Sequence, residues 1–143
     1  MEVPGLTFTR DGLEPILQSA RTNYLLGSVS GSCGKSEEGK SRFELAAAVA
    51  AADQIRWACL AAQRPPGFNR VQWQDRLQSA LEQAASRSET CAYPSWWLYT
   101  AGSLERELDR AQDAEISIQK ALLSPDRMLA YHFTRLARSA ATP

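Results

Sequence analysis

Apolar residues recur three and four positions apart along most of this chain, and that spacing constrains its fold more than any other feature. The pattern begins near Asp11 and is clearest in residues 43–62, 73–84, 97–108 and 114–122. No stretch alternates convincingly at the two-residue period of a half-buried strand. The sequence therefore predicts an all-α fold of five to seven helices joined by short connections.

Breaker residues divide this helical pattern into segments. Gly27, Gly31 and Gly34 weaken the first segment, since each glycine costs about 1 kcal/mol relative to alanine inside a helix. Residues 64–67, Arg-Pro-Pro-Gly, end a later segment. The stretch before them forms either one long helix or two helices with a break near Asp53.

Capping residues predict where several helices begin. Ser36, followed by two glutamates, and Asn69 both stand directly before apolar-periodic stretches. Pro94 and the Ser124-Pro125 pair have the form of a first helical turn, where proline is tolerated. We expect a helix to start at each of these four places.

Length and local composition predict one domain. Residues 1–10 contain Pro4 and Gly5 and show no sustained periodicity, so they are predicted to be a flexible tail. A chain of 143 residues has enough material for one hydrophobic core. Residues 11–140 are therefore expected to form a single helical-repeat domain.

The charge balance argues against a nucleic acid partner, and the short apolar runs argue against a membrane partner. Sixteen Lys and Arg residues balance sixteen Asp and Glu residues, so no basic face for phosphate contacts is visible. No apolar run approaches the roughly 20 residues of a membrane-spanning helix, and residues 1–10 lack the features of a signal peptide. We expect a cytoplasmic protein.

The residues that usually carry chemistry are few and scattered. Cys33, Cys59 and Cys91 form neither a disulfide framework nor a zinc motif, which predicts free thiols in a reducing compartment. His132, the only histidine, lies in an apolar stretch without a nucleophile or second metal ligand that can be placed beside it. We therefore expect no metal, no cofactor and no enzymatic activity.

One segment supports an alternative. The sequence VSGSCGKS, which begins at Val29, approaches the phosphate-binding pattern GxxxxGK[ST], with valine in place of the first glycine. In such a loop Gly34, Lys35 and Ser36 would hold phosphate and magnesium, and Tyr24-Leu25-Leu26 would form the preceding strand. However, no later apolar strand ends in a magnesium-binding Asp, and no parallel sheet can be assembled.

Two stretches resemble the tetratricopeptide repeat. In that family a small residue closes one helix against the next, a turn reverses the chain, and a small, a large and a small residue pack from the second helix. Those places are occupied in the first stretch by Gly27, Gly34, Gly39, Phe43 and Ala46. They are occupied in the second stretch, which runs from Trp96 to Asp126, by Ala101-Gly102, Asp109, Asp113-Ala114, Ile118, Ala121 and Pro125.

The chain also departs from the family pattern. Gly27 and Gly102 are 75 positions apart, which is not a multiple of the 34-residue repeat. Ser30 and Glu105 stand where the family prefers a large aromatic residue, and Gly39 replaces the usual alanine. Residues 54–94 would then have to form a degenerate hairpin with a long Pro-rich loop.

The resemblance implies antiparallel helical hairpins stacked as a short solenoid, with an irregular helix bundle as the alternative. It further implies an interaction scaffold whose groove receives a peptide or helix of a partner protein. The register places seven residues in this groove: Arg21, Tyr24 and Ser28 from the first hairpin, and Trp96, Tyr99, Ser103 and Arg106 from the second.

Few repeats would leave apolar edges exposed, which a partner or a second copy of the chain would cover. The remaining alternative is a regulatory or assembly domain that binds through its outer surface.

Overall fold

The computed structural model describes residues 15–91 and 93–123, and every regular element in these ranges is a helix. Six helices have defined bounds: α2 (Ala20–Ser32), α3 (Ser36–Ala47), α4 (Ile55–Ala62), α5 (Arg70–Thr90), α6 (Pro94–Glu107) and α7 (Ala111–Leu122). The all-α prediction is confirmed for this part of the chain. None of these helices is long and apolar enough to span a bilayer. The predicted tail, the predicted helix from Ser124 and His132 lie outside the described residues.

Tertiary contacts divide the chain into two compact units. In the described ranges, unit 1 consists of residues 15–50 and 57–68, and unit 2 consists of residues 51–56, 69–91 and 93–123. The boundary passes through α4, whose first two residues belong to unit 2. The single domain predicted for residues 11–140 stays a prediction.

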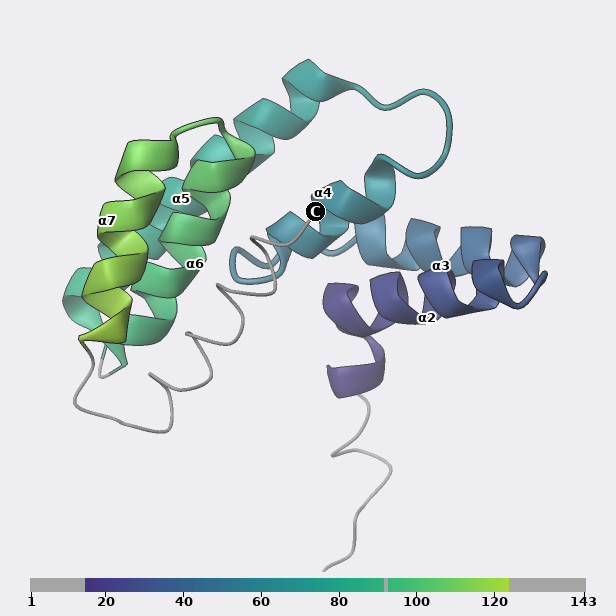
Figure 1. Ribbon diagram of the computed structural model, residues 1–143, viewed down its shortest axis with the longest axis horizontal. Coiled ribbons are helices and arrows are strands. Elements are labelled where there is room, and N and C mark those ends of the chain that lie inside the picture. The colour runs from purple at the N-terminus through teal and green to yellow at the C-terminus, as the bar shows by residue number, and fades with distance from the viewer. Residues whose placement is uncertain (1–14, 92, 124–143) are drawn as a thin grey trace, which may run out of the picture. The chain divides into compact units, whose positions relative to one another are not determined.

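Unit 1 is built around a hairpin of α2 and α3, which lie side by side (Figure 1). Glycines set their separation. A Cβ atom added to Gly27 would lie 2.9 Å from Cε1 of Phe43, and one added to Gly39 would lie 2.9 Å from the Gly27 carbonyl oxygen. The expected close approach of these two helices is therefore confirmed, and Phe43 covers the space beside Gly27.

Unit 2 contains a second hairpin, α6 with α7, and a longer helix, α5, that packs against α6 (Figure 1). A Cβ atom on Gly102 would lie 2.7 Å from Cγ1 of Ile118 and 3.0 Å from the Ala114 carbonyl oxygen. The buried stripe of α5 recurs at helical spacing. It consists of Trp73, Leu77, Ala80, Leu81 and Ala84.

The two hairpins turn in the same way. Each turn has one residue in the left-handed region, Gly34 at φ 76° and Asp109 at φ 60°. The next residue donates its backbone N–H to the carbonyl oxygen five positions earlier, which satisfies a free carbonyl at the helix end. These bonds join Lys35 to Ser30 at 2.9 Å and Arg110 to Glu105 at 2.8 Å.

The helix bounds and contacts confirm three expectations, among them the helix start at Pro94, and two others are wrong. Of the two alternatives left open, one long helix or two with a break near Asp53, the second is confirmed, because α3 ends at Ala47 and α4 begins at Ile55. The side chain of Asn69 accepts from the backbone N–H of Gln72, as expected for an N-cap. Ser36, by contrast, is the first residue of α3, whose N-cap position has no side-chain hydrogen bond.

The hairpin predicted for residues 54–94 is also wrong, since α5 packs against α6 and most of α4 belongs to unit 1.

Candidate functional site

Three aromatic side chains from three helices meet in unit 1. Tyr24 of α2 lies between Phe43 of α3 and Trp57 of α4, with ring centroids 5.9 Å and 5.5 Å away. The rings are inclined by 55° and 50°, which is among the tilted arrangements that aromatic pairs favour. All three residues are half-buried, so part of each remains accessible.

Two exposed arginines lie over these rings. The Arg21 Cζ atom is 5.6 Å from the Trp57 ring centroid, and the Arg64 Cζ atom is 5.4 Å from Tyr24 and 5.7 Å from Phe43. Arg64 also donates from Nη2 to the Tyr24 hydroxyl at 2.6 Å. We call these five residues the aromatic–arginine cluster.

The two guanidinium groups of the cluster keep their charge available. Within the described ranges neither forms an ion pair with a carboxylate. Their attraction to the ring faces contributes about 0.5–1 kcal/mol each at such exposed sites and holds them against the aromatic surface. The cluster therefore presents two positive charges over an accessible apolar base.

The residues around Tyr24 support its position. Asn23 is only 3% exposed, and its amide donates to the carbonyl oxygens of Leu17 and Ser19 while its oxygen accepts from Arg42. Every one of these bonds fixes the first turns of α2. The hydroxyl of Ser28 donates to the Tyr24 carbonyl at 3.0 Å, so it is used within its own helix.

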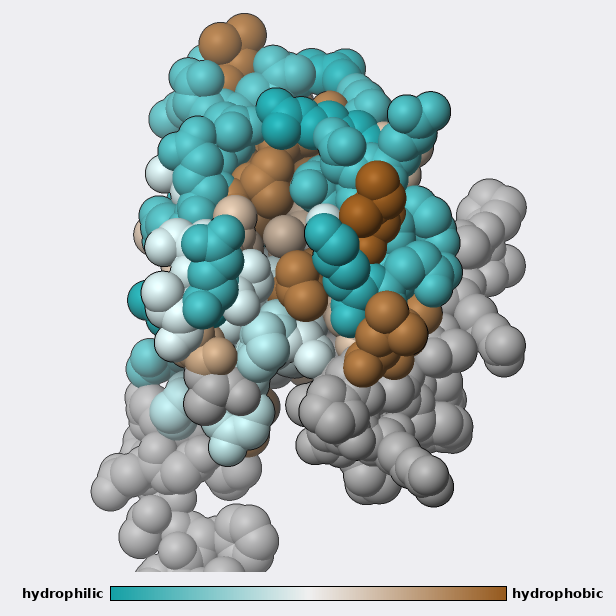
Figure 2. Space-filling view, turned by 90° about the vertical axis from the view of Figure 1, so that its left-hand side faces the viewer, coloured by the Kyte–Doolittle hydropathy of each residue, from teal (hydrophilic) through white to brown (hydrophobic). Residues whose placement is uncertain are grey.

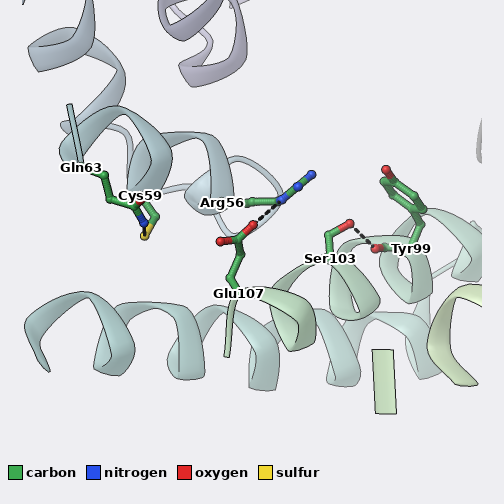
Figure 3. Close-up of polar contacts among 6 residues, drawn as sticks. All are labelled: Arg56, Cys59, Gln63, Tyr99, Ser103 and Glu107. Atoms are coloured by element: carbon green, nitrogen blue, oxygen red, sulfur yellow. Dashed lines mark hydrogen bonds and ion pairs between the residues drawn. The ribbon is translucent and has the colours of Figure 1, made fainter. Parts of the chain in front are cut away.

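The predicted groove residues of unit 2 lie along α6. Trp96 is 41% exposed, whereas Tyr99 and Arg106 are half-buried. Ser103 is buried, and its hydroxyl donates to the Tyr99 carbonyl at 2.9 Å (Figure 3). Ser103 thus repeats the bond that Ser28 makes, 75 positions earlier. The joint groove formed by both sets of residues stays a prediction.

A partly buried ion pair fixes the end of α6. Arg56 donates from Nε to Glu107 Oε1 at 2.9 Å, and the two side chains are only 23% and 20% exposed (Figure 3). Both residues belong to unit 2. The pair ties the first turn of α4 to the last turn of α6.

Sequence reasoning named Arg21 and Tyr24 as groove residues, and both belong to the aromatic–arginine cluster, but it did not name Trp57 or Arg64. Trp57 lies in a mostly apolar stretch, and Arg64 lies in the proline-rich connection, 40 positions after Tyr24. Neither has a local signal of function. Their convergence depends on how α4 packs, which the linear pattern does not specify.

The segment of the phosphate-binding alternative is a helix-to-helix turn. Tyr24, Leu25 and Leu26 lie in α2, so the strand expected there is absent. The backbone N–H groups of Gly34 and Lys35 donate to carbonyl oxygens of α2, at 3.1 Å and 2.9 Å. They are thus used to close the hairpin.

Charges at the start of α3 also oppose an anion there. Glu37 and Glu38 occupy its first turn, and the Lys35 amine lies 3.7 Å from a Glu38 carboxylate oxygen. Negative side chains at a helix N-terminus take the place that a phosphate would favour. In this geometry Gly34, Lys35 and Ser36 serve the hairpin turn.

Unit 2 contains two further arginine–aromatic pairs, with Arg76 over Trp73 at 4.0 Å and Arg87 over Trp97 at 4.8 Å. Figure 2 shows one face of the molecule, where hydrophobic residues form separate small patches in a mostly hydrophilic surface. Cys33 and Cys91 are exposed free thiols and Cys59 is buried. Within the described ranges, no group of three or more His, Cys, Asp and Glu residues is arranged to hold a metal ion.

Comparison of the chain with protein-family models, curated proteins and solved structures finds no match. Function is therefore inferred from the geometry of the two units.

Proposed function

We propose that this protein is a binding scaffold of the tetratricopeptide type, whose aromatic–arginine cluster holds an acidic peptide segment of a partner protein. The observation that carries the proposal is the pair of exposed, carboxylate-free guanidinium groups of Arg21 and Arg64 over half-buried rings. Arginine and aromatic residues supply most of the binding energy in protein interfaces.

The chemistry of the cluster favours a carboxylate ligand. A guanidinium group matches a carboxylate with two parallel hydrogen bonds, which adds directionality to the charge attraction. Arg64 is already held by the Tyr24 hydroxyl and by two rings, so little side-chain freedom is lost when a ligand binds. The accessible parts of Trp57 and Phe43, which are both half-buried, offer apolar contacts for residues beside the carboxylate.

The repeat character rests on the common offset of the two hairpins. Gly102, Asp109 and Ile118 each lie 75 positions after a residue with the same role: Gly27, Gly34 and Phe43. The shared glycine contacts and the shared turn support descent of both hairpins from one structural unit. A scaffold that presents residues on short helical hairpins is consistent with this organisation.

The test uses the full chain and a phage-displayed library of random 12-residue peptides. We expect selected peptides to be enriched in Asp and Glu. Binding of the resynthesised peptides is then measured by fluorescence anisotropy. Arg64→Ala and Arg21→Ala should each weaken it about tenfold, which corresponds to about 1.4 kcal/mol.

Arg87→Ala is the matched control. The Arg87 guanidinium lies 4.8 Å from the Trp97 ring centroid in unit 2, so this variant removes the same type of arginine–aromatic contact elsewhere. It should leave peptide affinity within twofold of wild type. Selected peptides without acidic enrichment, or equal affinity in the Arg21 and Arg64 variants, would contradict the proposal.

A further inference from the structure

Helix α6 is covered by α5 along a defined stripe. Trp97 marks this stripe, because Arg87 of α5 lies over its ring at 4.8 Å. One and two turns further, Ala101 and Leu104 continue the same stripe and are 5% and 0% exposed. Beyond the end of α6, Arg110 donates to Gln78 of α5 at 2.9 Å. At both ends of this stripe the contacts therefore come from the same helix, α5, which packs against α6.

The same stripe on α2 is open. At the 75-position offset, Leu26 corresponds to Ala101 and Val29 corresponds to Leu104, yet they are 38% and 60% exposed. Leu25, beside them, is 47% exposed, and Cys33 at the end of the stripe is also exposed. Within the described part of unit 1, only α3 packs extensively against α2, and it does so on the side of Gly27.

We propose that this open face of α2, formed by Thr22, Leu25, Leu26, Val29 and Cys33, binds one amphipathic helix of a partner protein. The partner helix occupies on α2 the position that α5 occupies on α6. Tyr24 points to a different side of α2, where it meets Trp57. The proposal therefore does not depend on the aromatic–arginine cluster.

The absence of charged residues on this face of α2 defines the chemistry of the partner helix. No residue from Thr22 to Cys33 is charged, so an ionised side chain in the contact would lose water without gaining a partner. The stripe that touches α2 must therefore be uncharged. The middle of helix α5 offers the pattern, because Leu77, Ala80, Leu81 and Ala84 are buried there while Glu82 is exposed.

The size of the surface favours a single helix over a second copy of the chain. The 13 residues of α2 span about 20 Å, the length of a short helix contact. One pair of short helices covers a few hundred Å², whereas stable protein interfaces bury about 800 Å² on each partner. A short amphipathic helix needs no larger surface to bind with modest affinity.

The experiment titrates a synthetic peptide with the sequence of residues 70–90 into the full-length ¹⁵N-labelled protein. This peptide is the probe because α5 already covers the equivalent stripe on α6. We expect saturable amide shift changes in residues 22–33. Val29→Glu and Leu26→Glu should each weaken binding about tenfold.

Ile116→Glu is the matched control, because Ile116 is a similarly exposed apolar residue, 54% accessible, on α7 of unit 2. The Ile116→Glu variant should bind the peptide with the same affinity as the wild type. Absence of binding, shift changes confined to α6, or unchanged affinity in the Val29 and Leu26 variants would overturn the proposal. If sedimentation shows that the wild type is a dimer and that Val29→Glu dissociates it, the face binds a second copy of the chain. This outcome would also overturn the proposal.

Discussion

Gly27 and Gly102 occupy the same place in two hairpins that begin 75 positions apart. At Gly27 an added Cβ atom meets the Phe43 ring at 2.9 Å and the Gly39 carbonyl oxygen at 3.0 Å. At Gly102 it meets Ile118 at 2.7 Å and the Ala114 carbonyl oxygen at 3.0 Å. In both hairpins a missing side chain lets the second helix approach and pack a large apolar residue against the first.

This relationship predicts that Gly102→Ala lowers the free energy of unfolding by about 1–3 kcal/mol, the usual cost of overpacking a filled site. Gly27→Ala should also lower the free energy of unfolding. The backbone oxygen on one side prevents simple relief by side-chain movement. Urea denaturation followed by circular dichroism measures the change.

Gly31→Ala provides the control, because a Cβ atom there meets nothing within 4 Å. Alanine should raise stability at this helical position by up to about 1 kcal/mol. If Gly102→Ala proved as stable as Gly31→Ala, the inferred close approach of α6 and α7 would be incorrect.

The left-handed turn residues predict opposite effects for two substitutions. Asp109 has φ 60°, where a residue with a Cβ atom is strained and glycine is not. Asp109→Gly should therefore raise the melting temperature, by a stabilisation of about 0.5–1 kcal/mol. Gly34→Ala places a Cβ atom at φ 76° and should lower stability by about 1 kcal/mol.

Asp109 also pairs with Arg70 at 3.2 Å, but the side chains are 71% and 81% exposed, so this pair contributes little. Arg70→Ala isolates that contribution and should change stability by less than about 0.5 kcal/mol. Destabilisation by Asp109→Gly well beyond the Arg70→Ala effect would count against the strain at this turn.

Burial should make the coupling free energies of two ion pairs differ, Arg56–Glu107 and Arg70–Asp109, both formed by described residues of unit 2. Arg56 and Glu107 are 23% and 20% exposed, and their hydrogen bond is 2.9 Å. A double-mutant cycle with Arg56→Ala and Glu107→Ala should give a coupling free energy of about 1–2 kcal/mol. The free energies of unfolding in this cycle are calculated from denaturation midpoints with a common m-value.

The exposed Arg70 and Asp109 pair is the comparison. A second double-mutant cycle uses Arg70→Ala and Asp109→Asn, because asparagine removes the charge and still tolerates a left-handed φ. Its coupling free energy should be less than about 0.5 kcal/mol. Equal coupling in the two cycles would show that burial does not strengthen the Arg56–Glu107 contact. Added salt should weaken the exposed pair more than the half-buried one.

The half-buried side chain of Glu105 illustrates a limit of local patterns. In the sequence, Glu105 stands where the tetratricopeptide family prefers a large aromatic residue, and its acidic neighbours suggest a solvated face. In the folded chain its Oε2 atom is buried and makes no hydrogen bond to the described residues. Which atoms surround a carboxylate is decided by helix packing, and the spacing of charges along the chain does not reveal it.

The sequence by itself determined where helices form and where several of them end. Helical propensity, the cap at Asn69 and the glycines that set helix approach act over a few residues, so the linear pattern predicts them. The two hairpins were predictable for the same reason, because their contacts join neighbouring helices through short turns.

Only the tertiary structure decided which distant residues meet. It placed Trp57 and Arg64 beside Tyr24, and it paired α5 with α6 rather than with α4. It also covered one stripe on α6 and left the equivalent stripe on α2 exposed. These outcomes depend on how helix faces compete for burial across long separations in the chain, and that competition is settled only when all the helices pack together.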